Sequence, residues 1–443
     1  MSAPRCVNDR LRSLITEVGW SGGELAKAVN MVAAETGLRL SYGRASVGQW
    51  LAGARPRSPG PELVAEALSR ALRRPVAVAD TGLSRVVAAG EGEFDVRMEL
   101  VHLADATSAT RRDVLRHCVY NLGALAAAGI AESLPVRDFS GARDVGRIGR
   151  TEVEAAAAAL RLFSDAEGVL GAGIMRRPLA DYLAGTVAPW LAAASTATVR
   201  QQFLSVAAEL AYLCGFMCFD DELHGAAQRY YRLSLRLSGE AEDVRGYAVA
   251  LRSMSSQAYI LGHYRQAADL AEAAVETAAT KVSPSTKAFL AGQLAVSAAA
   301  TEDSGAATAH LIAAERHLDG SSDPAATTGA YHHASLAHQR AVVRARLGDK
   351  VGAIAALAES IRRRPAGEQR AEVIMLARRA ELQLDCGHVE EAAVTWGRFV
   401  DVYPAVRSGR ACTALRTMKA RLRPYQKIPL IGSLLHQAAT LNG

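Results

Sequence analysis

The chain has 443 residues, of which 50% are hydrophobic, 5% aromatic and 22% charged, and its formal net charge is +6. This length predicts two to four domains with sizeable buried cores, and the few aromatic residues favour closely packed helices. No secretory signal follows Met1 and no apolar run reaches about 18 residues, so the composition excludes exported and membrane-spanning proteins and predicts a cytoplasmic one.

The positive charge is concentrated at the two ends of the chain. Residues 1–82 contain eleven basic and seven acidic side chains, a net charge of +4, and residues 404–443 contain seven basic and no acidic ones. Basic ends are typical of proteins that contact a polyanion, although a solvated basic tail is also common. The six cysteines form no C-x-x-C pair, which indicates free thiols and no metal site.

The first predicted elements are two helices. Residues 8–18 place their leucines, isoleucine and valine on one face. Ser21 and Glu24 form a capping box, so a second helix should begin at Gly22, and it should end near Gly37.

A short helix over residues 44–52 has the composition of a helix that enters the DNA major groove. Its predicted core residues are Val47, Trp50 and Leu51. Its predicted base-reading residues are Arg44, Ala45, Ser46, Gly48 and Gln49. Small residues let the backbone approach the groove, and Arg or Gln can make paired hydrogen bonds to base edges. Arg55 and Arg57 follow the helix and should contact phosphates. The pattern alone leaves open an ordinary helical hairpin packed by Trp50.

The end of this helix, from Trp50 through Gly53 to Arg55-Pro56-Arg57, resembles the xenobiotic-response-element type of helix-turn-helix. The resemblance implies a DNA-binding domain over residues 1–83, completed by a helix over 61–73. The connection over residues 36–43 is longer than the usual tight turn of that family, so the angle between the two helices stays open.

Residues 84–149 are predicted to be a helical linker. Two helices are expected over 94–131, with a break near Thr107-Ser108, and the second of them, from Thr110 onward, is apolar enough to be buried. The glycines and proline of residues 135–149 predict a loop.

Residues 150–405 are predicted to form an α-solenoid of helical hairpins, so the fold class is all-α. Five segments align on a small residue, with intervals of 41, 40, 46 and 39 residues, at Ala226, Ala267, Ala307, Ala353 and Ala392. A small residue lets paired helices approach closely, and stacked pairs bury the apolar face that a single pair would leave exposed. The turns before Ala267 and Ala392 resemble those of tetratricopeptide repeats, with a longer period.

Segments at the start of this array carry a second resemblance. Arg150-Thr-Glu-Val-Glu, Phe163-Ser-Asp-Ala-Glu-Gly, Ala188-Pro-Trp-Leu and Ala207-Ala-Glu-Leu-Ala resemble the central region of a large actinobacterial family. Its members join a helix-turn-helix to tetratricopeptide-like repeats and are regarded as transcriptional regulators. The resemblance covers most of the chain and implies a regulator without specifying its effector.

Residues 406–443 are predicted to be a basic C-terminal helix, about 406–422, and a tail. Its cations are Arg407, Arg410, Arg416, Lys419, Arg421 and Arg423. The helix dipole favours cations near a C-terminus, and contact with DNA beside the operator is the functional alternative.

No nucleotide-binding, hydrolase, metalloprotease or kinase motif is found, so we expect no enzyme and no cofactor. Several residues are interpreted as a polar row on the concave face of the array, not as metal ligands: His310, Glu315, His317, His332, His333 and His338. The sequence predicts a homodimeric transcriptional regulator that binds double-stranded DNA and takes a peptide or small-molecule effector in its repeats. The alternative is a scaffold whose repeats bind another protein and whose N-terminal domain does not bind DNA.

Overall fold

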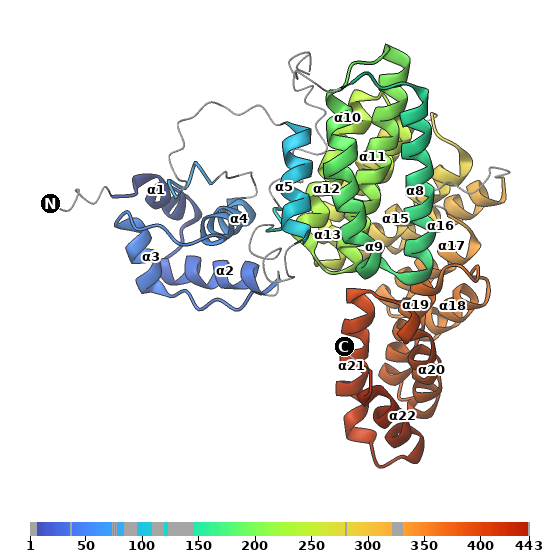
Figure 1. Cartoon of the computed structure of the whole chain (residues 1–443). Coiled ribbons are helices and arrows are strands. Elements are labelled where there is room, and N and C mark those ends of the chain that lie inside the picture. The colour runs from blue at the N-terminus through green and yellow to red at the C-terminus, as the bar shows by residue number, and fades with distance from the viewer. Residues whose placement is uncertain are drawn as a thin grey trace.

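The computed structural model describes residues 7–35, 38–72, 74, 76, 78–83, 95–108, 119–122, 146–279, 281–320 and 331–441. Every regular element in these ranges is a helix (Figure 1). The all-α fold class is therefore confirmed.

Four helices form an N-terminal unit: α1 (Asp9–Val18), α2 (Gly22–Glu35), α3 (Arg44–Leu51) and α4 (Gly60–Leu72). The predicted capping box is confirmed. The N–H of Ser21 donates to the Glu24 carboxylate at 2.7 Å, and the N–H of Glu24 donates to the Ser21 hydroxyl at 3.3 Å. The four helices share one apolar core, which runs from Leu11 to Leu83.

The next helix, α5 (Val96–Ser108), belongs to the body of the array. Leu100 and Leu103 are fully buried, and they lie in the same core as the first helices of the array. Glu99 accepts two hydrogen bonds from Arg229 of the array, at 2.6 and 2.8 Å. The helix predicted from Thr110 to residue 131 is wrong at residues 119–122, which are not helical, and its other residues lie outside the described ranges. Residues 84–94 and most of the predicted loop 135–149 also lie outside the described ranges.

The array opens with four elements: α8 (Arg150–Leu170), α9 (Ala172–Tyr182), η1 (Leu183–Val187) and α10 (Ala188–Ala192). The last three pack against α5, and α8 packs against α9. Five helical hairpins follow in sequence: α11 (Ala197–Asp220) with α12 (His224–Glu240), α13 (Val244–Ile260) with α14 (Tyr264–Ala278), α15 (Pro284–Ala300) with α16 (Ser304–Asp319), α17 (His333–Arg346) with α18 (Lys350–Arg362), and α19 (Gln369–Asp385) with α20 (Val389–Val402).

The second helix of each hairpin begins in the same way. The residue five before the aligned alanine has a positive φ, which is +84° at Gly262 and +83° at Gly387. Ala267, Ala307, Ala353 and Ala392 are each 0% exposed. In α12 the alanine at the equivalent place is Ala227, four residues after Leu223, which precedes the helix. The alignment predicted Ala226 instead. Both alanines are buried. The alignment chose Ala226 because it placed the turn at Asp221, whereas the residue with positive φ is Glu222, one residue further along the chain.

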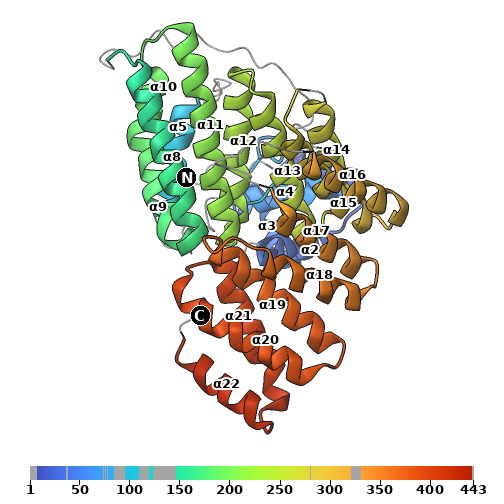
Figure 2. The ribbon, with the colours of Figure 1, turned by 90° about the vertical axis from the view of Figure 1, so that its right-hand side faces the viewer.

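The two ends of the array meet (Figure 2). The N–H of Arg407 donates to the carbonyl of Leu170 at 2.7 Å, and the carbonyl of Arg407 accepts from Gly173 at 2.8 Å. Gly171 has φ +83°, and a Cβ there would collide with the Arg407 carbonyl, so only glycine fits. The predicted α-solenoid of helical hairpins is confirmed, and these contacts close the array by joining its first helices to the segment that follows its last hairpin.

Beyond the hairpins the chain continues as η2 (Tyr403–Ala405), α21 (Gly409–Leu422), η3 (Arg423–Tyr425) and α22 (Pro429–Ala439). The prediction of one more helix in this region omitted α22. Leu415 and Ile431 are fully buried in a core that begins at Ala341, so the basic C-terminal region is part of the array.

Helix α11 has an unusually apolar composition. Within the described residues it is long and apolar enough to cross a bilayer, with 24 residues and a mean hydropathy of 1.5 in its most apolar window. In the structure 72% of that window is buried. Packing on both sides inside the array accounts for this composition.

Candidate nucleic-acid interface

Helix α3 has one buried and one exposed side. Val47 and Trp50 are 0% and 3% exposed, and Leu51 is half-buried. Four of the predicted base-reading residues are exposed on the other side: Arg44, Ala45, Gly48 and Gln49. A Cβ at Gly48 would meet nothing within 4 Å. The exposed side is therefore smooth, with Arg44 and Gln49 as its long polar side chains.

Ser46 lies at the flank of α3 and serves the start of the helix. Its hydroxyl accepts the N–H of Gly43 at 3.3 Å, and its side chain is half-buried. Gly43 is extended, with φ −131°, and directs the chain into the helix. Ser46 thus has a capping contact in addition to the predicted one to DNA.

The long connection before α3 is held by one side chain of α2. The Asn30 amide donates to the carbonyl of Tyr42 at 2.8 Å, and its oxygen accepts the N–H of Tyr42 at 3.0 Å. The Tyr42 ring packs edge-on against Trp50, with 5.0 Å between ring centroids. A Cβ on Gly22 would be 3.4 Å from Val47, so α2 and α3 approach closely. The angle between these helices, open from the sequence, is set by these contacts.

Arg55 and Arg57 follow α3 and are both exposed. Neither makes an ion pair with any residue that the structure describes. In Figure 1, α3 lies on the side of the N-terminal unit that faces away from the array, with α4 between them. The side of α3 that carries Arg44 and Gln49 is thus not covered by the array.

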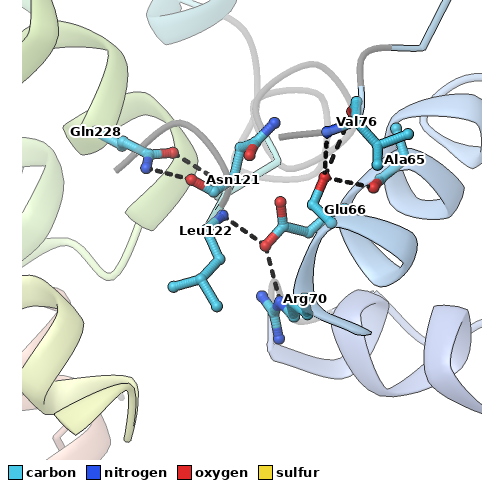
Figure 3. A network of polar contacts seen from close by, with 8 residues as sticks. Ala65, Glu66, Arg70, Val76, Asn121, Leu122 and Gln228 are labelled. Carbon is cyan, nitrogen blue, oxygen red and sulfur yellow. Dashed lines mark hydrogen bonds and ion pairs between the residues drawn. The ribbon is translucent and has the colours of Figure 1, made fainter. Parts of the chain in front are cut away.

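A four-residue segment, 119–122, joins the N-terminal unit to the array (Figure 3). On one side, the N–H of Leu122 donates to the carboxylate of Glu66 at 2.6 Å. Glu66 lies on α4, is 0% exposed, and also pairs with Arg70 at 2.7 Å. The carboxylate therefore binds a backbone group of the segment and a cation of its own helix.

On the other side, the segment is bound by the array. The Gln228 side chain of α12 accepts the N–H of Asn121 at 2.7 Å and donates to its carbonyl at 2.6 Å. Tyr120 is 2% exposed and stacks on His263, with 5.8 Å between ring centroids and 3° between ring planes. Paired hydrogen bonds and a stacked ring hold the segment in one orientation, and through it the N-terminal unit.

The polar residues expected on the concave face have separate surroundings. His332 contacts Glu368 at 2.8 Å, and Glu315 contacts Arg340 at 3.0 Å. His338 lies inside the array beside several arginines. No group of three potential metal ligands occurs in the described parts of the chain.

The fold and this interface define an all-helical protein in which a four-helix unit with an exposed short helix is attached to a closed array of helical hairpins. The family described as SP15 N-terminal domain matches residues 11–84. This match coincides with the N-terminal unit and does not extend to the array. No curated protein matches the chain.

Proposed function

We propose that this protein is a cytoplasmic, sequence-specific DNA-binding regulator of transcription, and that its array mediates dimerisation, effector binding or both. The observation that carries the proposal is the exposed outer side of α3, with Arg44 and Gln49 beside Ala45 and Gly48, on a helix whose other side is buried. This is the arrangement that a helix needs to enter the major groove.

In this proposal each exposed residue has a separate task. Ala45 and Gly48 allow the backbone to approach the bases, and Gln49 and Arg44 make paired hydrogen bonds to base edges. Arg55 and Arg57 bind phosphates and fix the position of the helix. A two-fold dimer would match two half-sites separated by one helical turn of DNA or a multiple of it. An effector bound in the array would act by changing the spacing of the two helices.

The first test is immunoprecipitation and sequencing of genomic DNA bound by the wild type, by Gln49→Ala and by Gln202→Ala. Gln202 is an exposed glutamine of α11 and is the matched control. We expect sharp peaks with a shared inverted repeat for the wild type and the control, and their loss in Gln49→Ala. No enrichment in any sample under several growth conditions would contradict the proposal.

Titration of a recovered site then separates base contacts from phosphate contacts. Loss of one paired contact costs about 1–3 kcal/mol, so Gln49→Ala should weaken binding about 5- to 150-fold at that site and change its sequence preference. Arg55→Ala with Arg57→Ala should weaken binding to all sequences and reduce the salt slope by about 0.9 per lost contact.

The alternative remains a scaffold in which α3 does not bind DNA. The hydrogen bond from the Gly43 N–H to the Ser46 hydroxyl favours the scaffold in part. With Ser46 occupied there, only Arg44 and Gln49 are left among the predicted base-reading residues to form side-chain hydrogen bonds to bases. A double Arg44→Ala and Gln49→Ala variant that keeps the cellular phenotype of the wild type would support the scaffold.

A further inference from the structure

The closed array surrounds a cavity of two adjoining chambers, with volumes of about 210 and 610 Å³. We call it the arginine cavity. The chambers share a wall formed by α13, α17, α19 and α21, which includes Arg252, His338 and Arg410. Volumes of a few hundred Å³ are typical of small-molecule sites. The arginine cavity thus has the size for a small ligand.

The lining of the arginine cavity carries charge of one sign. Among the residues that the structure describes, no aspartate or glutamate lines either chamber. Its cations are Arg252, Arg346, Arg364, Arg370, Arg378 and Arg410. A concave surface with cations of one sign and low-dielectric walls concentrates anions.

Four of these cations are bound by other groups. Arg364, Arg370 and Arg378 each contact a carboxylate outside the lining, at 2.6, 3.3 and 3.0 Å respectively. Arg346 lies over the ring of Tyr264 at 4.4 Å. Arg252 and Arg410 make no ion pair with any described residue, and neither does Arg346; unlike Arg346, which lines the larger chamber alone, Arg252 and Arg410 line both chambers.

Arg252 is held by neutral groups. Its guanidinium lies 4.0 Å from the centroid of the Phe289 ring, and its Nε has no hydrogen-bond partner in the described residues. With the Gln339 amide turned to donate to Tyr331, the Gln339 oxygen accepts from Arg252 at 3.2 Å. The contacts position the guanidinium and leave its charge unbalanced.

Arg410, on α21, is the second cation of this kind, without an ion pair to any described residue. Its guanidinium is 5.4 Å from the centroid of the Phe219 ring, and it donates no side-chain hydrogen bond to a described residue. Burial lowers the pKa of both Arg252 and Arg410, yet arginine remains protonated in proteins. The carboxylates of Asp220 and Glu222 attract Arg410 without making an ion pair with it. Cations that are partly shielded from water and lack a paired carboxylate are unfavourable, and an anion in the cavity would relieve this cost.

His338 gives independent support. Burial, followed by the nearby Arg364 and Arg410, lowers the pKa of His338 to about 3. The imidazole is therefore neutral at physiological pH, and one ring N–H can donate to an anion. Its surroundings indicate that several guanidinium groups act on the same small volume.

The rest of the lining suits the organic part of a ligand. Phe216, Phe219, Phe289 and Tyr331 line the smaller chamber, and Tyr259 and Tyr264 line the larger one. Aromatic rings favour flat or apolar ligand groups, whereas guanidinium groups bind phosphate or carboxylate in a planar fork.

We propose that the arginine cavity binds a small organic anion with at least two negative charges, phosphate or carboxylate, and a flat or apolar body, with Arg252 and Arg410 as its anchors. The role of the cavity as the effector site of a transcriptional regulator rests on the proposed function, whereas its binding of an anion does not.

A first test needs no ligand. Arg410→Met removes a cation that has no ion pair, so without anion it should raise the melting temperature by about 1–3 °C. Arg370→Met, which leaves carboxylates without their cation, should lower it. A decrease for Arg410→Met comparable to that for Arg370→Met would mean that Arg410 is structural and would overturn the proposal.

The second test measures binding by calorimetry and thermal shift, with pyrophosphate, ADP, isophthalate and adenosine as probes. We expect ADP or isophthalate to bind the wild type and the exposed control Arg362→Ala equally, and to bind Arg252→Met and Arg410→Met about tenfold or more weakly. Pyrophosphate should bind less tightly than ADP, and neutral adenosine should not bind detectably. ADP without isophthalate would identify phosphate as the anion, and the reverse would identify carboxylate. No binding of any anionic probe at millimolar concentration would overturn the proposal.

The same preparations, titrated with DNA, separate the two proposals. A protein that binds DNA and none of the anionic probes retains the proposed function and loses the anion site. A protein that binds anions through Arg252 and Arg410 and does not bind DNA retains the site and loses the function.

Discussion

Besides the backbone hydrogen bonds of Arg407, a buried cation joins the ends of the array, and its removal should be costly. Arg370 of α19 contacts Glu167 of α8 and Asp220 of α11, which are 5% and 0% exposed. Removing one partner of a buried ion pair typically costs about 3–5 kcal/mol, because the remaining charges stay buried. We expect Arg370→Met to lower the free energy of unfolding by about that amount at pH 8.

The pH dependence of this variant is a second, stricter part of the prediction. Burial, opposed by Arg370 and reinforced by Asp220, raises the pKa of Glu167 to about 7. A carboxyl whose folded pKa exceeds its unfolded value stabilises the fold at low pH and loses that contribution as pH rises through the folded pKa. Without Arg370 the pKa of Glu167 should rise further, so the cost of Arg370→Met should shrink between pH 8 and pH 6.

Urea unfolding, followed by circular dichroism at both pH values, measures these effects. Glu167→Gln in the same chain should restore part of the loss at pH 8, and the exposed Arg362→Met is the control. A loss below about 1 kcal/mol at pH 8, or one that does not change with pH, would refute the role assigned to Arg370.

Three further predictions concern other parts of the molecule. Burial and the nearby Arg364, Arg410, Arg252 and Arg378 lower the pKa of His338 to about 3. Below pH 6.5 the free energy of unfolding of the wild type should therefore fall by at most about 1.4 kcal/mol per pH unit through this group. The stability of His338→Gln should depend less on acid, and an unchanged dependence would contradict the assignment. Asn30→Ala removes both hydrogen bonds to Tyr42 and should destabilise the N-terminal unit by about 1–3 kcal/mol in hydrogen exchange, with the array unaffected. Gln228→Ala should leave both units folded and loosen their attachment; small-angle scattering should detect a larger radius, and an unchanged profile would count against the role of segment 119–122.

Local features of the chain were predictable, because their causes are local. The capping box at Ser21 and the apolar spacing around Trp50 act within a few residues, so they located α2 and α3 closely. The repeated alanines also followed from a periodic packing need, and the single displaced position, Ala227, was missed because an alanine also stands directly before it.

Features that depend on distant residues were not predictable. Leu170 and Arg407 lie in contact across more than two hundred residues, and neither has a sequence pattern that indicates its partner. Asn30 was overlooked because a lone asparagine in a helix carries no information about the loop that it holds. Arg252 was not singled out from the sequence, and Arg410 was considered only for contact with DNA; closure of the array places both in one cavity.

Closure of the array also has a consequence for folding. An open helical repeat protein can unravel from a free end, because each unit touches only its neighbours. Here the first helices contact the last ones, which raises the mean sequence separation of contacts and predicts slower folding. We therefore expect one cooperative unfolding transition for the whole array. During synthesis, α8 and α9 must wait for the segment around Arg407 to leave the ribosome before their packing is complete.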